Sequence, residues 1–594
     1  MESDIWDVVI IGTGLPESIV ASGLSLRGYK VLVIDENFTY GGVWNTVKYK
    51  HFSDCMSEKL SEKDNFIFDS SCFYGKKFEN NENEEDTSKI VIDLIPKVLF
   101  SRGKLVELII SCNITNYLDF QGIEDVYYCE LKNKGNNKND EDIETLGDIN
   151  NDLSEYLHSC EFMCLRTPFS KSDIFSSNDL SLVEKRQIMR LYNGLKEIIE
   201  LRNVDEKKVD IDLINDPFRS PALISNSEIS KKNRNESGKV EFELFSEFQD
   251  KWKINDKILN LIKHTISFII NKSKDEFDSI NDFEKYLNLL LCSLNQHGCT
   301  GTPFIYPCYG ICDLIQAFSR LAAVKGALQR LGTKIINMEL LDNIWNLEIK
   351  GENTSSEIIK CRLIITPYRN NIINCFLNNI NNKFNDLTLV GENNNGIEKG
   401  VICAVAILDS PLSILGGNNK ISTLTLNVSD CNIEECNYDN VVSILQCNSH
   451  TGCCSNKHYI VYLNMVIEKN VNEYMERHRD YIYSLLDYLV NSKNHNTKIL
   501  GKASYFYKQK LTDPKLLSNE NILFLPDPCI NNNSFLLLDE DVEKSLISLE
   551  YSLKFLKPGD NYISHKNFYL SPNLELVPNE VKYNNHGSTG EKES

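Results

Sequence analysis

No part of this 594-residue sequence is an uninterrupted apolar run of about 18 residues, the minimum for a helix that spans a membrane. The first residues do not form a secretory leader, and the last residues contain no cysteine that could carry a prenyl group. We therefore expect a cytosolic protein that neither spans a membrane nor carries an anchor of its own.

Basic residues are scarce relative to acidic ones. The chain has 63 Lys and Arg against 84 Asp and Glu, a formal net charge of −21. This balance disfavours nucleic acids and anionic membrane surfaces as partners, because both repel an acidic protein. The length allows more than one domain, and we expect at least two.

Catalytic and metal-binding patterns are also lacking. No grouping of Ser, His and Asp and no carboxylate pair stands out as a catalytic centre. The 19 cysteines are scattered through apolar segments, which favours reduced thiols over a disulfide framework. Four candidate zinc ligands crowd one segment: Cys447, His450, Cys453 and His458. They include no C-x-x-C pair, and a hairpin turn explains their crowding, so we predict no metal site.

What the chain does contain, at its start, is an altered dinucleotide-binding turn. Residues 7–11 are an apolar run typical of a buried parallel strand, and Gly12 and Gly14 supply a tight turn into a helix. The position of the third glycine is Glu17, whose carboxylate suits the helix dipole but competes with a phosphate for the same N–H groups. Pro16 removes one of those donors. We interpret the turn as one that has lost its ligand, and we expect no cofactor.

The rest of a βαβ unit is intact. A helix near residues 19–24 leads to a second strand at 30–34. Asp35 and Glu36 follow, where a flavin or nicotinamide enzyme holds the ribose. Binding of FAD therefore remains an alternative, although two glycines with a downstream acid are a weak signal.

Helical patterns dominate residues 123–297. Ser181 and Glu184 form a capping box. Apolar residues at helical spacing continue from Leu182 to Ile199 and recur at 258–269 and 283–294. Strand patterns return later, at 334–336, 344–349, 361–365, 423–428, 441–446 and 459–466.

These patterns predict an α/β fold, with a Rossmann sheet domain of the FAD/NAD(P)-binding type and a smaller inserted α-helical domain. We assign residues 1–122 and 298–577 to the sheet domain, 123–297 to the helical domain and 578–594 to a disordered tail. Polar segments, which we expect to be loops, interrupt the chain at 80–86, 133–152, 231–239 and 392–398.

A later helix, expected at residues 313–331 and ended by Gly332, carries a polar ridge. Asp313, Gln316 and Arg320 lie at positions i, i+3 and i+7, beside an apolar stripe that includes Val324 and Leu328. Taken alone, such a ridge is more often a solvated face than an interface.

Several blocks together resemble the Rab GDP-dissociation inhibitor and Rab escort protein family. They are residues 7–42 with Tyr40-Gly41-Gly42, residues 92–97, residues 302–320, and the strand and helix near 522–526 and 542–556. The resemblance implies a flavoprotein-like sheet domain without flavin. It also implies a platform for GDP-bound Rab made of Tyr40, Asp313, Gln316 and Arg320. Thr39, Asp313 and Arg330 depart from the family's usual residues, so the Rab preference stays open.

The escort branch of that family is favoured by residues 172–175 and 182–186. In escort proteins the matching Phe and Arg dock the α subunit of Rab geranylgeranyltransferase, which assigns this role to Phe175 and Arg186. The alternative is that Phe175 packs beneath its own helix as a hydrophobic staple.

The resemblance implies a non-catalytic accessory protein. It would bind unprenylated GDP-bound Rab, present it to the transferase, hold the geranylgeranyl lipid in an apolar groove of the helical domain and deliver the product transiently to membranes. The alternatives are a Rab GDP-dissociation inhibitor that recycles prenylated Rab, and an FAD-dependent oxidoreductase.

Overall fold

The computed structural model describes most of the chain up to residue 557. The described residues are 5–56, 73–80, 89–133, 160–206, 245–266, 286–297 except 288, 301–368 except 353, 399–415, 419–427, 441–468, 471–491, 497–530 except 510, 512 and 518–520, and 538–557. The tail expected at 578–594 and nearly all of the four polar segments lie outside them. Within the described residues, no helix is long and apolar enough to cross a membrane.

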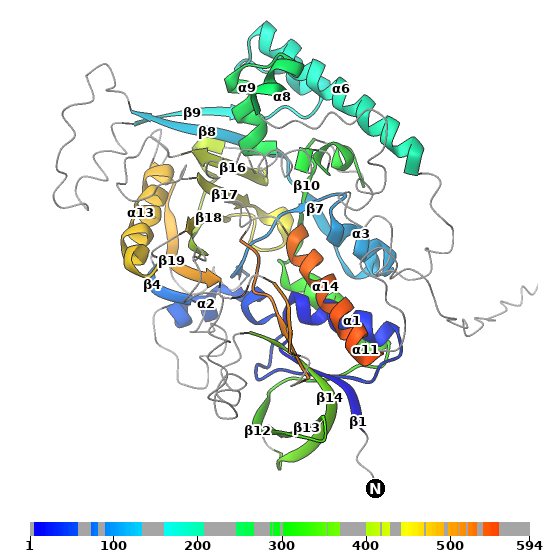
Figure 1. Cartoon of the computed structure of the whole chain (residues 1–594). Helices are drawn as coiled ribbons and strands as arrows, with labels where there is room; N and C mark the ends of the chain where they lie inside the picture. The colour runs from blue at the N-terminus through cyan, green and yellow to red at the C-terminus, as the bar shows by residue number, and fades with distance from the viewer. Residues whose placement is uncertain are drawn as a thin grey trace, which may run out of the picture. The chain divides into compact units, whose positions relative to one another are not determined.

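The first and last parts of the chain share one eight-stranded sheet (Figure 1). In its centre β1 (Ile5–Ile11) lies between β2 (Val31–Ile34) and β14 (Glu357–Pro367), parallel to both. The other strands are β11 (Leu328–Arg330), β12 (Thr333–Leu341), β13 (Ile344–Gly351), β20 (Lys515–Leu517) and β21 (Ile522–Leu525). Strand β21 runs parallel to β14. The prediction that the second half of the chain completes the Rossmann sheet is confirmed.

Three helices lie beside this sheet: α1 (Leu15–Leu26), α11 (Cys312–Val324) and α14 (Asp539–Leu556). Helix α1 contacts both of the others, and its apolar side chains are buried. The close approach of α1 to α14 requires Gly23, because a Cβ there would lie 2.5 Å from Leu549 Cδ2. The N-terminal turn and α11 are thereby held in one packed layer.

A second eight-stranded sheet was not predicted as a unit. Its order is β4 (Phe73–Asn80), β19 (Ile499–Gln509), β15 (Lys399–Leu408), β18 (Tyr459–Glu468), β17 (Val441–Cys447), β16 (Ser422–Asn427), β8 (Asp125–Asn133) and β9 (Cys160–Arg166). Helix α13 (Val471–Asn491) packs on β15 and β19 over an apolar core. Sequence patterns located several of these strands individually, but not their pairing across hundreds of residues.

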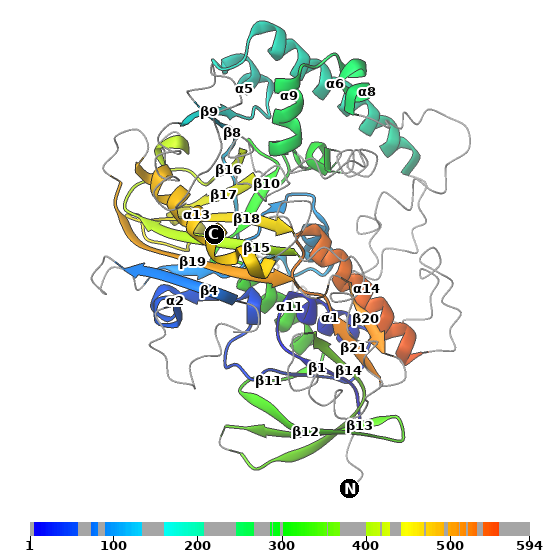
Figure 2. The same ribbon diagram turned by 60° about the vertical axis from the view of Figure 1, so that its left-hand side comes forward.

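The segment expected to be helical begins with β8 and β9 and continues in helices (Figure 2). These are α5 (Lys171–Ser176), α6 (Leu182–Glu206), α8 (Phe245–Trp252), α9 (Asp256–Leu261) and the π-helix η7 (Ile262–Ile266). The capping box of α6 is confirmed. The Ser181 N–H donates to Glu184 Oε2 at 2.7 Å, and the Glu184 N–H donates to Ser181 Oγ at 3.3 Å. The predicted domain boundaries at 122 and 297 stay predictions.

Short elements connect these layers. They are η1 (Gly42–Trp44), β3 (Thr46–Lys48), α2 (Tyr49–Met56), β5 (Val91–Asp93), β6 (Leu99–Phe100), α3 (Lys104–Ser111), η3 (Thr115–Tyr117), β7 (Phe120–Gly122), β10 (Phe304–Pro307), η9 (Ser413–Leu415) and η10 (Ser449–Thr451). Strand β10 pairs with β6 and β7, and β3 pairs with β5.

The structure corrects two helix predictions. The helix expected at 313–331 ends at Val324, and residues 328–330 instead form β11, which pairs with β2. Gly326, with a φ of +100°, makes this early exit possible. Leu182 does not belong to the buried stripe of α6, because this residue is 74% exposed. Leu180, just before the N-cap, takes the buried place instead.

One pair of cysteines departs from the expectation of reduced thiols. Cys129 on β8 and Cys164 on β9 stand directly opposite each other and form a disulfide. The pairing of two strands, which the sequence did not predict, brings them together. The other cysteines that the structure describes with their side chains are free thiols.

Candidate functional site

The altered dinucleotide turn is filled by Glu17. Its side chain folds back on the turn, so that a Cβ added to Gly12 would lie 3.5 Å from Glu17 Oε1. Burial raises the pKa of Glu17 to about 7, with smaller contributions from nearby Asp35 and Asp527. Oε2 of Glu17 has no hydrogen-bond partner among the described residues. Glu17 therefore blocks the turn by its bulk, and it carries only part of a negative charge at neutral pH.

Asp35, the expected ribose-binding acid, is engaged within the protein. Thr13 Oγ1 donates to Asp35 Oδ2 at 2.6 Å, and the Asn37 N–H donates to Asp35 Oδ1 at 2.8 Å. The Gly41 N–H donates in turn to Thr13 Oγ1 at 3.1 Å. These bonds tie the first turn to the loop that carries Tyr40.

The described residues do not fit a dinucleotide. A pyrophosphate needs free N–H groups in the first turn of α1. Pro16 has no N–H, and the N–H of Ser18 donates to Gly14 O at 3.0 Å. The Glu17 side chain thus lies where a diphosphate would be held, and Asp35 is already bonded within the protein.

Tyr40 lies beside α11, as the resemblance implied. Its hydroxyl donates to Gln329 Oε1 at 2.7 Å, and Gln329 Nε2 donates to the carbonyl of Ser319 on α11 at 2.6 Å. The thiol of Cys312, in the first turn of α11, donates to the Tyr40 carbonyl at 3.4 Å. Both ends of Tyr40 are thus bonded, directly or through one residue, to α11.

Asp313, Gln316 and Arg320 follow the polar face of the same helix. Asp313 is half-buried, and its pKa is raised by burial and then by nearby Asp119. Gln316 and Arg320 are exposed, one helical turn apart. The structure therefore brings these three side chains and Tyr40 onto one side of α11 and its neighbouring loop.

Tyr117, which the sequence did not single out, extends this group. The guanidinium of Arg320 lies over the Tyr117 ring, with Cζ 4.1 Å from the ring centroid. Tyr117 stands at the end of η3, a short turn without a recognisable pattern. No sequence signal connects two residues so far apart in the chain.

Arg330, which differs from the family's usual residue, has a local structural role. Its guanidinium forms an ion pair with Glu357 at the start of β14. The carbonyl of Arg330 accepts from the Asp35 N–H at 3.0 Å. Both contacts of Arg330 therefore stabilise the edge of the first sheet.

The second candidate surface lies where α5 meets α6 (Figure 2). Phe175 is 67% exposed, so it does not pack beneath its own helix as a staple. Lys185 Nζ donates to the Phe175 carbonyl at 2.9 Å, which holds Phe175 beside the first turn of α6. Exposed Arg186 follows directly, and Leu182 and Val183 are exposed in the same turn. An apolar patch with an adjacent guanidinium is typical of a protein contact.

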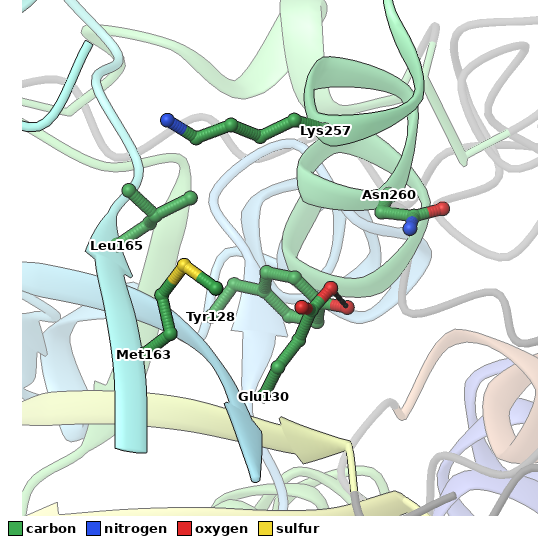
Figure 3. Close-up of a pocket in the computed structure, with 6 residues that line it drawn as sticks. All are labelled: Tyr128, Glu130, Met163, Leu165, Lys257 and Asn260. Atoms are coloured by element: carbon green, nitrogen blue, oxygen red, sulfur yellow. Dashed lines mark hydrogen bonds between the residues drawn. The ribbon is translucent and has the colours of Figure 1, made fainter. Parts of the chain in front are cut away.

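A pocket of about 320 Å³ opens between the β8–β9 pair and α9 (Figure 3). Its lining mixes apolar and polar side chains: Tyr128, Glu130, Met163, Leu165, Lys257 and Asn260. The Tyr128 hydroxyl donates to Glu130 Oε1 at 2.8 Å, and Lys257 Nζ lies 3.4 Å from Glu184 Oε1. This mixed lining differs from the apolar groove expected for a lipid.

The residues weighed as zinc ligands lie around the expected hairpin turn between β17 and β18. Cys447 and Cys453 are buried, and His458 Nδ1 lies 2.7 Å from Ser455 Oγ. The backbone N–H of His450 donates to Asn448 Oδ1 at 2.9 Å. In the described part of the chain, no group of three or more His, Cys, Asp or Glu residues has metal-binding geometry.

Comparison with known proteins matches this sequence to one family. The model of the family described as GDP dissociation inhibitor matches residues 1–215 and 222–376. Rab proteins geranylgeranyltransferase component A of Drosophila melanogaster is 24% identical over 354 residues, which cover 57% of this chain and 55% of the fly protein. Rab GDP dissociation inhibitor beta of Rattus norvegicus is 24% identical over 366 residues, covering 61% of this chain and 62% of the rat protein.

A solved structure supports this fold. The crystal structure of Rab GDI from Plasmodium falciparum has a TM-score of 0.59 to this chain at 18% identity, and the match covers 93% of this chain and 98% of that one. The chain spans between about half and two thirds of the length of the curated relatives named above. Because the family model matches more than half of its residues, this chain belongs to the GDP dissociation inhibitor family.

Proposed function

We propose that this protein is a Rab escort protein. It binds newly made, GDP-bound Rab through Tyr40, Asp313, Gln316 and Arg320, which we call the platform. It then presents the C-terminal cysteines of Rab to Rab geranylgeranyltransferase and delivers the prenylated product to membranes. The protein itself makes and breaks no covalent bond.

The observation that carries the escort role is the exposed Phe175 beside Arg186. A phenylalanine that is 67% exposed gains little within the folded chain, since most of its apolar surface stays in water. Burial against a partner would remove that surface from water and release a large part of this free energy. We assign the partner as the α subunit of the transferase, with Arg186 supplying hydrogen bonds at the rim of the contact.

The platform supports the Rab-binding half of the proposal. Exposed Gln316 and Arg320 offer hydrogen-bond donors, and Tyr40 and Tyr117 offer aromatic surface beside them. Arg and Tyr are over-represented among the residues that dominate protein interfaces. Such a surface suits a folded partner better than a small molecule.

A Rab GDP-dissociation inhibitor that recycles prenylated Rab is the second candidate. It is favoured by the rat inhibitor, which is as similar to this chain as the fly component A. The two roles differ in whether the transferase is recruited.

Size-exclusion chromatography separates these candidates. An escort protein, mixed with unprenylated GDP-bound Rab and the transferase, elutes as a complex of all three. An inhibitor leaves the transferase in its own peak. Rab that never co-elutes with this protein would overturn both roles.

An FAD-dependent oxidoreductase remains as an enzyme-class alternative, and the filled turn at Glu17 argues against it. The purified protein should be colourless, and addition of FAD should leave its thermal unfolding temperature unchanged. A yellow preparation, or stabilisation by FAD, would contradict the proposed loss of the cofactor.

A further inference from the structure

Asp93, at the end of β5, lies at the centre of a buried hydrogen-bond cluster behind the platform. Its carboxylate accepts from the hydroxyls of Thr46 and Tyr306 and, at 3.1 Å, from the N–H of Ile311. The N–H of Asp93 donates to the Tyr462 hydroxyl at 3.0 Å. Asp93 is almost fully buried, so each of these bonds is shielded from competition with water.

Thr46 connects this cluster to α11. Its hydroxyl donates to Asp93 Oδ1 and accepts the N–H of Cys312, in the first turn of α11, at 3.1 Å. Thr46 begins β3, six residues after Tyr40. The thiol of Cys312 donates to the Tyr40 carbonyl. One hydroxyl therefore ties the Tyr40 loop to the start of the helix that carries the rest of the platform.

The turn before α11 is shaped to allow this contact. Gly310 has a φ of +96°, and a Cβ at this position would collide with Asp93 Oδ1 and Thr46 Oγ1. The N–H groups of Ile311 and Cys312, at the N-terminal end of α11, point at the Thr46–Asp93 pair. These two N–H groups fix where the helix begins, and the adjacent Asp313 takes its position from them.

We infer that Thr46 and Asp93 are positioning residues that set the spacing between Tyr40 and the α11 side chains for binding of GDP-bound Rab. The inference rests on the proposed function. Neither residue needs to touch Rab. Loss of the Thr46 hydroxyl leaves the Cys312 N–H without its acceptor, which frees the first turn of α11 to shift and misplaces Asp313 relative to Tyr40.

Three substitutions test this role. Thr46→Val removes the hydroxyl at nearly constant volume, and Thr46→Ser keeps it. Thr302→Val is the matched control: Thr302 lies just before β10, and its hydroxyl donates to the Ile123 carbonyl, away from α11. Each variant is checked by thermal unfolding, and its affinity for GDP-bound Rab is measured by titration calorimetry.

We expect Thr46→Val to weaken Rab binding about tenfold or more. This is the size of effect expected when one hydrogen bond that positions the binding residues is lost. Thr46→Ser and Thr302→Val should both bind within about twofold of the unsubstituted protein. Unchanged Rab affinity in Thr46→Val would overturn the inference. So would an equal loss in Thr302→Val, because the effect would then be general destabilisation.

Hydrogen exchange gives a readout that does not depend on Rab. The Cys312 amide should exchange faster in Thr46→Val and at the original rate in Thr46→Ser. If the unsubstituted protein fails to bind Rab, the proposed function is wrong, and the exchange rates still decide the positioning role. Equal Cys312 exchange in all variants would refute it.

Discussion

Gly14 and Glu17 face each other so closely that a Cβ at residue 14 would lie 2.5 Å from Glu17 Oε2. The glycine leaves room for the carboxyl group of Glu17 where a dinucleotide-binding protein leaves room for phosphate. One side chain is thus enough to fill this turn, with both glycines kept.

Burial of Glu17 makes folding stability depend on pH. The pKa of Glu17 is raised from 4.5 to about 7 in the folded protein, so the folded state binds the Glu17 proton more tightly than the unfolded state. The resulting contribution to folding stability is complete below pH 4.5 and is lost as the pH rises through 7. At about 1.4 kcal/mol for each pH unit in this interval, the free energy of unfolding should fall by roughly 3 kcal/mol. Glu17→Gln should remove this fall. Urea unfolding at pH 5 and pH 8 checks the prediction, and an identical pH dependence in both proteins would contradict it.

Arg320 should contribute to Rab binding and not to recruitment of the transferase. Arg320→Ala removes the guanidinium and its contact with Tyr117, and we expect Rab affinity to fall by roughly 1–3 kcal/mol. Titration calorimetry with GDP-bound Rab measures the loss. Arg186→Ala is the matched control, since it removes the same charge from α6 and should leave Rab affinity unchanged. If Arg320→Ala binds Rab normally, Arg320 does not belong to the platform.

Phe175 should act in the opposite way. Phe175→Ala removes the exposed ring and should weaken transferase recruitment by about 2 kcal/mol or more, with Rab binding intact. Ile358→Ala, on β14, serves as control because Ile358 is 65% exposed and lies on a different element. Surface plasmon resonance with the immobilised transferase measures recruitment by the two variants, and titration calorimetry with GDP-bound Rab measures their Rab binding. Loss of Rab and transferase binding together would indicate misfolding and not a docking residue.

Lys97 and Asp541 form a buried ion pair between the segment after β5 and helix α14, with Lys97 Nζ 3.2 Å from Asp541 Oδ2. Lys97→Met leaves the Asp541 carboxylate buried without its cation, and should lower the free energy of unfolding by roughly 3–5 kcal/mol. Lys554→Met breaks the more exposed Lys554–Glu550 pair on the same helix and should cost about 1 kcal/mol or less. Guanidinium unfolding compares them, and equal losses would show that burial of the Lys97 pair is unimportant.

The sequence predicted those parts of the fold that depend on local pattern. The apolar runs at β1 and β2, the strand patterns at 334–336 and 344–349 and the capping box at Ser181 each reflect neighbours in the chain, and the structure has strands and a capping box there. The position of Glu17 in the turn was also predicted. Its raised pKa was not, because the burial that causes it comes from distant segments.

Long-range pairing could not be predicted. The disulfide between Cys129 and Cys164 follows from the register of two strands separated by a segment without a strand pattern. The Tyr117 contact with Arg320 and the Thr46 contact with Cys312 each join residues more than 200 positions apart. Sequence spacing carries no information about such contacts, so the platform could be proposed only by resemblance and its supporting cluster not at all.

Reconstituted prenylation tests the escort role most directly. Unprenylated GDP-bound Rab, Rab geranylgeranyltransferase and geranylgeranyl diphosphate are incubated with and without this protein, and lipid incorporation into Rab is followed by mass spectrometry. We predict that Rab is geranylgeranylated only when this protein is present. Rab that stays unmodified in the complete mixture, although it binds this protein, would contradict the escort role and favour a GDP-dissociation inhibitor.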